Sequence, residues 1–481
     1  MSERQYEMLI GLEVHAELAT QTKMFCRCPS RFGDPPNTNV CPVCLGLPGS
    51  LPVPNLEAVR LGVRAALALD CQVNLESTFD RKNYFYPDLP KGYQITQFEK
   101  PLAQGGYVEI EEPRKRIRIR RLHLEEDAGK SSHAGDDITT AEYSLVDHNR
   151  CGVPLVEIVS EPDMTSTEEA RQYLETLQKV LEFAQVSDVK MEEGSMRVDC
   201  NISVNRRGDP PGVPVELKNL SSFRAVARSL NFEFKRQTEA IAKGEKVVRE
   251  TRHWDEAKEV TESMRTKESS QDYRYFPEPD LPGLNLEERF VSEVRDGMPA
   301  LPGEITGRYV GDYGLTAYDA RVLTQSPHLV AYFDACLAAG ADPKTCSNWV
   351  AGDLLGYLKA KGISYDRIPV SPSNLAGMLR LIKEGTISGK TGKDVLLKMM
   401  DSGKDAAAIV KDEGLTQVSD DSELAGVVES VLKQNPAAVS DYVSGKQNAL
   451  GFLVGQVMKA TRGRANPAKV NTILKEKLLS K

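Results

Sequence analysis

The sequence predicts an α+β protein in which a strand-rich domain, with a mixed and largely antiparallel sheet, precedes two all-helical domains. At 481 residues the chain is long enough for about three domains of roughly 100–200 residues each. Apolar and polar residues alternate, as in strands, up to about residue 290, and from about Leu301 onward the apolar residues follow the helical period. We therefore expect domains at residues 1–295, 296–405 and 406–481.

Composition indicates a soluble globular protein. Hydrophobic residues make up 40% of the chain and charged residues 27%, which is enough apolar material for several cores. No apolar run approaches the length of a membrane span. The N-terminus enters a strand-like pattern at once, without the basic region, apolar stretch and cleavage site of a targeting peptide. These features predict a cytoplasmic protein with no membrane attachment.

The first strand pattern runs from Met8 to Leu18. Apolar residues take every second position, and Glu13, His15 and Glu17 lie on the other side. A later strand, residues 196–205, has a polar side formed by Asp199, Asn201 and Ser203. Each strand therefore has one side for the core and one polar side that is a candidate for function.

A hairpin is expected between the two, where Glu109 and Glu111 alternate with apolar residues before a turn near Pro113. Three arginines alternate in the same way on its second strand: Arg116, Arg118 and Arg120. Cross-strand Glu–Arg pairs would explain this pattern without any function.

Helical signals are of two kinds. Within the first domain, Ser221 or Ser222 is a suitable N-cap for a long helix that runs to about Lys243. The C-terminal half contains helical patterns at residues 326–339, 348–361, 373–384, 392–401, 421–434, 435–444, 449–461 and 466–479.

The segment from Asp147 to Asp163 is the strongest indication of a site. In strand alternation Glu157 shares its face with Leu155 and Val159, so a carboxylate stands where an apolar side chain is expected. A buried carboxylate is costly unless it binds a metal or pairs with a base. The preceding Asn149–Pro154 segment, which contains Arg150, has the Gly and Pro of a tight turn that would aim this strand.

Glu126 is a second carboxylate of this kind. After Arg120 the apolar positions shift by one residue, to Leu122 and Leu124, as a β-bulge would produce. The shift brings Glu126 into phase with the two leucines. By the same argument, adjacent Glu125 is out of phase with them.

Four of the nine cysteines lie close together. Cys26 and Cys28 are separated by twelve residues from the pair Cys41 and Cys44. Without a secretory signal, disulfides are disfavoured, and two close thiol pairs suit a tetrahedral zinc ion. The alternative is four unrelated reduced cysteines.

The dispersed polar residues on strands suit a magnesium and phosphate site. These candidates are Glu13, His15, Glu126, Glu157, Asp199 and Asn201. Mg²⁺ favours carboxylates together with the phosphates of a substrate. The lysine- and aromatic-rich segment that contains Lys82, Asn83 and Lys91 could supply positive charge for phosphates and rings for a base, or it could be a packed aromatic loop. Residues 385–391 resemble a P-loop but have three residues between the glycines where four are needed.

Charge leaves the question of nucleic acid open. The chain has 61 Lys and Arg against 69 Asp and Glu, and its net charge of −8 argues against nucleic-acid binding. Beyond Phe452, however, one acidic residue stands among seven basic ones: Lys459, Arg462, Arg464, Lys469, Lys475, Lys477 and Lys481. On charge alone this stretch would be a solvated helix face.

Several motifs spread over nearly the whole chain carry a resemblance to a known family. They are GLEVHAEL, DRKNYFYPD, KGYQITQF, LHLEEDAGKSSH, SLVDHNRCGVPLVEIVSEPD, SDVKMEEGSMRVDCNIS, ELKNLSSF, DYRYFPEPDLP and GFLVGQVMKATRGRANP. Through them the chain resembles the GatB family, the B subunits of the aspartyl/glutamyl-tRNA amidotransferases. The resemblance implies a cradle-shaped first domain, a helical domain and a helical tail that contacts tRNA.

The resemblance also implies a reaction. ATP phosphorylates the side-chain carboxylate of Glu on tRNA(Gln) or Asp on tRNA(Asn), and ammonia from an amidase, the A subunit, then displaces the phosphate. A small C subunit would complete a heterotrimer. A purely tRNA-binding scaffold, whose acidic strands hold structural ion pairs, is the alternative.

The family's site residues carry over to positions already singled out. Mg²⁺ would bind His15, Glu126 and Glu157, which with Lys82 form the expected catalytic group. ATP contacts are expected from Glu13, Lys82, Asn83, Lys91, Arg150, Asp199 and Asn201. Lys82 and Lys91 are candidates for phosphate contact or for the mouth of the ammonia tunnel. Zinc at the four cysteines would be a structural feature of part of the family, and tRNA contacts are expected from Lys459, Arg462, Arg464 and Lys469.

Overall fold

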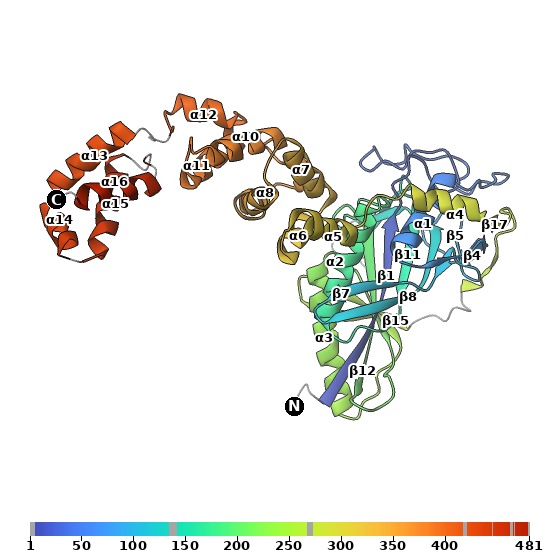
Figure 1. The fold of residues 1–481 in the computed structure, drawn as a ribbon. Helices are drawn as coiled ribbons and strands as arrows, with labels where there is room; N and C mark the ends of the chain where they lie inside the picture. Colours follow the sequence, from blue (N-terminus) through green and yellow to red (C-terminus); the bar gives the residue numbers. More distant parts are fainter. Residues whose placement is uncertain are drawn as a thin grey trace. The chain divides into compact units, whose positions relative to one another are not determined.

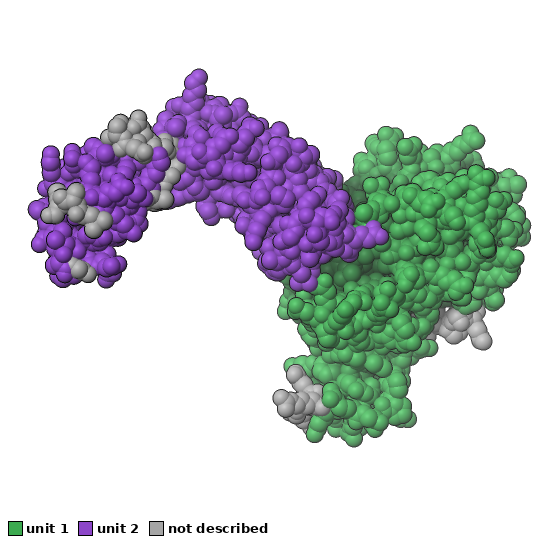
Figure 2. All heavy atoms as spheres, viewed as in Figure 1, with its two compact units in different colours: residues 1–302 green, residues 303–481 purple. Residues whose placement is uncertain are grey.

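A computed structural model describes residues 5–133, 142–266, 273–416, 421–444, 446–461, 465 and 467–479. The chain divides into two compact units, residues 1–302 and 303–481 (Figure 2). Unit 1 ends close to the predicted boundary at residue 295. The predicted division of the helical part near residue 405 stays a prediction.

Unit 1 is built on a ten-stranded sheet (Figure 1). In spatial order its strands are β15 (Val260–Thr266), β14 (Glu250–Asp255), β13 (Val215–Lys218), β12 (Met196–Arg206), β1 (Tyr6–Glu17), β11 (Pro154–Ser160), β8 (Arg114–Glu126), β6 (Ala103–Gln104) and β2 (Gln72–Val73), with β7 (Tyr107–Glu111) beside β8. Neighbouring strands are antiparallel except β13 and β14. The α+β class with a mixed, largely antiparallel sheet is confirmed.

Short strands complete the unit. They are β4 (Asp80–Asn83), β5 (Tyr93–Thr96) and β16 (Phe276–Pro277) in one sheet, β9 (Lys130–His133) with β10 (Ser144–Asp147), and β3 (Glu76–Ser77) with β17 (Leu284–Asn285). The predicted hairpin is β7 and β8. Of its three alternating arginines, Arg116 approaches Glu109 at 3.2 Å, as the ion-pair interpretation expects. Arg118 and Arg120 instead pair with Asp163 and Glu161, which lie outside the hairpin.

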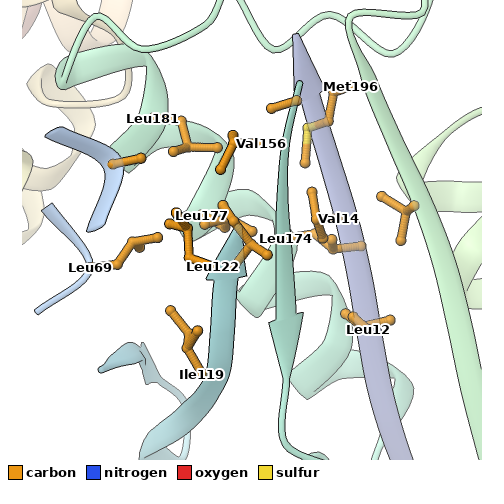
Figure 3. Close-up of a cluster of buried hydrophobic side chains, with 14 of the residues drawn as sticks. Leu12, Val14, Leu69, Ile119, Leu122, Val156, Leu174, Leu177, Leu181 and Met196 are labelled. Atoms are coloured by element: carbon orange, nitrogen blue, oxygen red, sulfur yellow. The ribbon is translucent and has the colours of Figure 1, made fainter. Parts of the chain in front are cut away.

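One face of the large sheet carries the hydrophobic core. Leu122 of β8, Val156 of β11 and Val14 of β1 pack with Leu174 and Leu177 of a covering helix (Figure 3). The helices of this unit are α1 (Leu56–Ala68), α2 (Thr167–Phe183), α3 (Phe223–Ala242) and α4 (Glu288–Asp296). The predicted cap of α3 is confirmed, because the Ser222 hydroxyl accepts the N–H of Ala225.

The register of the central strands determines which polar side chains meet on the other face of the sheet. On β1, His15 pairs with Glu157 of β11, and Glu13 pairs with Asp199 of β12. Glu157 in turn stands opposite His123 of β8. The predicted bulge is confirmed, because Val159 and Ser160 face Arg121 and Ile119, which leaves Arg120 as the additional residue. Polar side chains from neighbouring strands therefore meet on the side away from the core.

Unit 2 is helical. Its α-helices are α5 (Pro302–Tyr313, which begins at the last residue of unit 1), α6 (Ala317–Leu323), α7 (Pro327–Ala338), α8 (Pro343–Trp349), α9 (Leu355–Lys361), α10 (Pro372–Lys383), α11 (Gly389–Ser402), α12 (Ala406–Asp412), α13 (Asp421–Gln434), α14 (Pro436–Val443), α15 (Asn448–Ala460) and α16 (Pro467–Leu479). The helix predicted from residue 348 in fact starts at Pro343, because Asp342 caps the N–H of Thr345, and a π-helical turn over Val350–Leu354 links it to α9.

The last helices have a core of their own. Leu424 and Val428 of α13 pack with Leu453 and Val457 of α15 and with Leu474 of α16. Among the described residues, none of the helices has the length and apolar character needed to cross a membrane.

Candidate active site

The polar face of the large sheet forms the floor of a cavity of about 680 Å³. Five adjacent strands contribute side chains to it: Glu13 and His15 from β1, Arg197 and Asp199 from β12, Glu216 and Lys218 from β13, Glu157 from β11, and Arg121, His123 and Glu125 from β8. Because alternation sends every second side chain of each strand to this face, the sheet collects polar groups without opening the core behind it.

Three of these side chains converge closely enough to bind one cation. Ligand atoms of His15, Glu125 and Glu157 lie within 4.8 Å of one another. His15 Nε2 is 3.2 Å from Glu125 Oε1 and 3.4 Å from Glu157 Oε2. Glu125 and Glu157 are buried, with side chains 2% and 11% exposed, whereas the His15 side chain is 21% exposed.

The cluster contains Glu125 where Glu126 was predicted. Glu126 is indeed in phase with Leu122 and Leu124, but those leucines belong to the core face, so the phase that singled it out directs it away from Glu157. Its Oε1 instead accepts hydrogen bonds from the Lys91 ammonium and, at 3.0 Å, from Ile95 N. The expectation that Glu126 joins His15 and Glu157 is therefore corrected.

Electrostatics show that the cluster favours a positive charge. Burial acts to lower the pKa of His15, but the carboxylates of Glu157 and Glu125 outweigh it and raise the pKa to about 10. Burial likewise acts to raise the pKa of Glu157, yet His123 and His15 hold it well below its usual value. Two buried carboxylates beside a protonated imidazole form a site in which a cation can replace the imidazole proton.

The donor set fits a divalent cation. Two carboxylates suit Mg²⁺ or Mn²⁺, and three protein ligands leave coordination positions for substrate oxygens and water. The contacts of the buried Glu125 Oε1 are with the imidazoles of His15, at 3.2 Å, and His123, at 4.0 Å, and no lysine or arginine is paired with it among the described residues.

Positive charge and aromatic rings also line the cavity. Lys82 Nζ lies 5.1 Å from the centre of the Tyr273 ring and 5.8 Å from that of Tyr84. Phe98 and Tyr275 stack at 4.1 Å with an interplanar angle of 10°. Lys82 lines the cavity while aromatic rings pack around it, and contact of this segment with phosphates or a base stays a prediction.

Some of the other residues predicted to contact ATP line the cavity, and some do not. Glu13 and Asp199 line the cavity, and Asn201 donates to Glu13 Oε1 at 2.9 Å. Four residues lie outside the lining: Asn83, Lys91, Arg150 and Asn201.

Of these four, Asn83, Lys91 and Arg150 are held by other parts of the chain. Asn83 donates to the carbonyl of Arg274 at 2.8 Å, and Lys91 pairs with Glu126. Arg150 donates to the carbonyl of Gly129 at 2.7 Å and lies 3.4 Å from Asp127, which does line the cavity. The structure therefore does not bring them together with His15 and Glu157.

A second acidic group on the same face already contains a lysine. Glu13, Asp199 and Glu216 converge, but the Lys218 ammonium contacts Asp199 and lies 3.6 Å from Glu216. Contact with a lysine distinguishes this group from the His15 cluster, whose carboxylates have imidazoles as their near partners.

The four predicted cysteines come together. Their sulfur atoms lie within 4.8 Å of one another, and Cys41 Sγ and Cys44 Sγ are 3.9 Å apart. Sulfurs around a zinc ion with bonds of about 2.3 Å are separated by about 3.8 Å in a tetrahedron, so the cluster fits zinc. A hydrogen bond from Cys26 lowers the pKa of Cys44 to about 4, with help from the Lys23 ammonium at 3.6 Å.

The predicted tRNA contacts are only partly described. Lys459 is exposed near the end of α15, and Lys469 is half-buried on α16. Arg462 and Arg464 lie outside the described residues.

Comparisons with known proteins identify the family. The GatB/GatE catalytic domain matches residues 8–292, and a GatB domain matches residues 331–478. The chain belongs to this family. It is 51% identical over 478 residues to the B subunit of the aspartyl/glutamyl-tRNA(Asn/Gln) amidotransferase of Carboxydothermus hydrogenoformans, with 99% of each chain covered. It is 53% identical over 477 residues to the protein of the same name from Moorella thermoacetica, with 98% of this chain and 100% of that one covered.

Two residues of this GatB-family site were missed from the sequence, Glu125 and His123. The available signal was the polar series Arg121, His123 and Glu125, which alternates with Leu122 and Leu124. Treating that series as one face of a strand would have placed Glu125 and His123 together, although it could not have shown that Glu157 stands opposite them.

Proposed function

We propose that this chain is the GatB subunit of a tRNA-dependent amidotransferase and carries the ATP-dependent step. In this proposal the side-chain carboxylate of Glu on tRNA(Gln), or Asp on tRNA(Asn), attacks the γ-phosphorus of ATP, so that ADP leaves and an acyl phosphate forms. Ammonia from an amidase subunit then attacks the acyl carbon, and phosphate leaves as the amide forms. The observation that carries the proposal is the cluster of His15, Glu125 and Glu157 in a large polar cavity.

The chain's own residues have positioning and electrostatic roles in this step. His15, Glu125 and Glu157 would hold Mg²⁺, which when bound offsets phosphate charge and orients the transferred group. Lys82 and Arg121 add positive charge to the lining of the cavity. The substrate carboxylate is the nucleophile, so the proposal requires no protein nucleophile.

The Lys91–Glu126 pair is assigned a separate role. It lines a second cavity of about 200 Å³ together with Cys26, Cys44 and Gly152. We place the entry of ammonia on this side, which keeps Lys91 out of the set that contacts ATP. Zinc at the four cysteines would then stabilise one wall of this cavity.

Partners follow from the same proposal. An amidase and a small third protein, the A and C subunits, would complete the heterotrimer, which would act in the cytoplasm. The basic residues of the C-terminal helices would contact tRNA phosphates, which position the substrate without reading its sequence. Removing the residues after 405 should weaken tRNA binding by the complex and leave its glutaminase activity intact. Unchanged tRNA affinity would mean that this basic stretch is only a solvated helix face.

The central experiment measures phosphate release that depends on both ATP and misacylated tRNA. The reconstituted complex would be assayed with Glu-tRNA(Gln) and with Asp-tRNA(Asn), using the wild-type chain, Glu157→Gln and the control Glu109→Gln on β7, outside the cavity lining. We expect the first variant to lose the activity and the control to keep it. Wild-type rates with Glu157→Gln would favour a tRNA-binding scaffold instead.

A further inference from the structure

His123 is a buried histidine of the polar sheet face. Its side chain is 2% exposed and stands directly opposite Glu157 in the register of β8 and β11. Histidine at this depth needs a hydrogen-bond partner, because an unsatisfied ring nitrogen in the interior is costly. The identity of that partner determines its role.

The contacts of His123 point to Glu157. His123 Nε2 lies 3.1 Å from Glu157 Oε2, compared with 4.0 Å from Glu125 Oε1. Within the described part of the chain, its Nδ1 is buried without a hydrogen bond. A proton on Nε2 therefore satisfies the closest contact that the ring makes with a carboxylate, and this assigns the tautomer.

His123 is separate from the cation ligands. Ligand atoms of His15, Glu125 and Glu157 form the group within 4.8 Å of one another, and His123 is not part of it. Glu157 has two oxygens and therefore about four lone pairs, so it can accept one hydrogen bond from His123 and still bind a cation.

We propose that His123 is a positioning residue that donates its Nε2–H to Oε2 of Glu157 and thereby fixes this carboxylate for a divalent cation. The inference rests on the proposed function, because it concerns the same cluster. Groups that orient metal ligands in this way typically change metal affinity about 10–100-fold when they are removed. A buried ion pair that serves only stability is the alternative.

Mn²⁺ binding to the full-length chain, followed by electron paramagnetic resonance, separates the two. His123→Gln keeps an amide N–H near the position of Nε2, whereas His123→Asn places its amide near Nδ1, and His123→Leu has no donor. We expect His123→Gln to bind Mn²⁺ close to the wild-type affinity, and His123→Asn and His123→Leu to bind about 10–100-fold more weakly.

A matched control removes another buried polar group. Gln237 is fully buried on α3 and accepts the N–H of Val204 at 3.1 Å, on the core side of the sheet. Gln237→Leu should lower the unfolding midpoint as His123→Leu does, and leave Mn²⁺ affinity unchanged. If His123→Leu does not fold, the comparison of His123→Gln with His123→Asn decides.

Equal Mn²⁺ affinity in His123→Gln and His123→Asn would overturn the inference, as would the same loss of affinity in Gln237→Leu. These results differ from a failure of the proposed function. If the wild-type chain itself did not bind Mn²⁺, the cation site would be lost, whereas a wild-type site that is insensitive to His123 would remove only the positioning role.

Discussion

Glu125 and Glu126 are adjacent at the end of β8 and almost equally buried, with 1% and 2% of their surface exposed, but they face different surroundings. Glu126 accepts hydrogen bonds from Lys91 and from a backbone N–H, so its charge has a fixed partner. Glu125 faces the cavity beside Glu157, with imidazoles as its near neighbours. The difference shows why only one of them is a candidate ligand, since a carboxylate that is already paired with an ammonium has little to gain from a metal.

The largest effects are expected when each glutamate in turn is replaced by glutamine. Glu125→Gln should weaken Mn²⁺ binding by more than the roughly 10–100-fold expected for an outer group, and should leave the unfolding midpoint nearly unchanged. Glu126→Gln should do the reverse, because an unpaired buried Lys91 costs about 3–5 kcal/mol of stability.

Metal titration and urea unfolding of both variants test this contrast. The double variant Lys91→Met with Glu126→Gln should recover part of the lost stability, because it removes both charges. If Glu126→Gln also lost Mn²⁺ affinity, the two glutamates would share one site and the comparison would fail.

The next largest effect is expected from replacing a cysteine of the cluster, which should abolish zinc binding. Elemental analysis of the purified chain should find about one zinc ion per molecule, and Cys44→Ser should remove it, because a structural site needs all four ligands. Cys71→Ala, which changes a buried cysteine outside the cluster, should retain zinc. If the wild-type chain contained no zinc, the alternative of four unrelated reduced cysteines would hold.

Two glycines near the cysteines test how closely the chain packs against Lys91. A Cβ at Gly46 would clash with Cγ of Lys91, whereas one at Gly49 would meet nothing within 4 Å. Both have positive φ, +66° and +84°, so alanine strains the backbone at each. We expect Gly49→Ala to cost about 1 kcal/mol and Gly46→Ala about 2–4 kcal/mol in urea unfolding, because the second also displaces Lys91.

The smallest effect is expected at Glu109, a half-buried glutamate of the adjacent hairpin that lies outside the cavity lining. Its pKa is lowered by hydrogen bonds from Arg116 and Arg114, but both partners are in solvent. Glu109→Gln should change neither Mn²⁺ affinity nor the unfolding midpoint measurably. A clear loss of Mn²⁺ affinity in this variant would mean that charge anywhere near β8, rather than contact with the cavity, controls binding.

Local sequence patterns were sufficient to predict much of the fold. Strand alternation in residues 8–18 placed His15 and Glu13 on a polar face, and the phase slip after Arg120 indicated a real bulge. The spacing of Cys26, Cys28, Cys41 and Cys44 predicted their convergence. These features depend on neighbours within a few residues, or on the geometry of short loops, which the sequence displays directly.

The choice between Glu125 and Glu126 was decided by tertiary structure. The sequence determined that these residues point to opposite sides of β8, because side chains alternate along any strand. Which side faced the core and which faced Glu157 depended on the pairing of β8 with β11 and on the helices that cover Leu122 and Leu124. Strand register and packing arise from contacts between distant segments, so only the folded chain shows that Glu157 meets Glu125 and His123 while Glu126 meets Lys91.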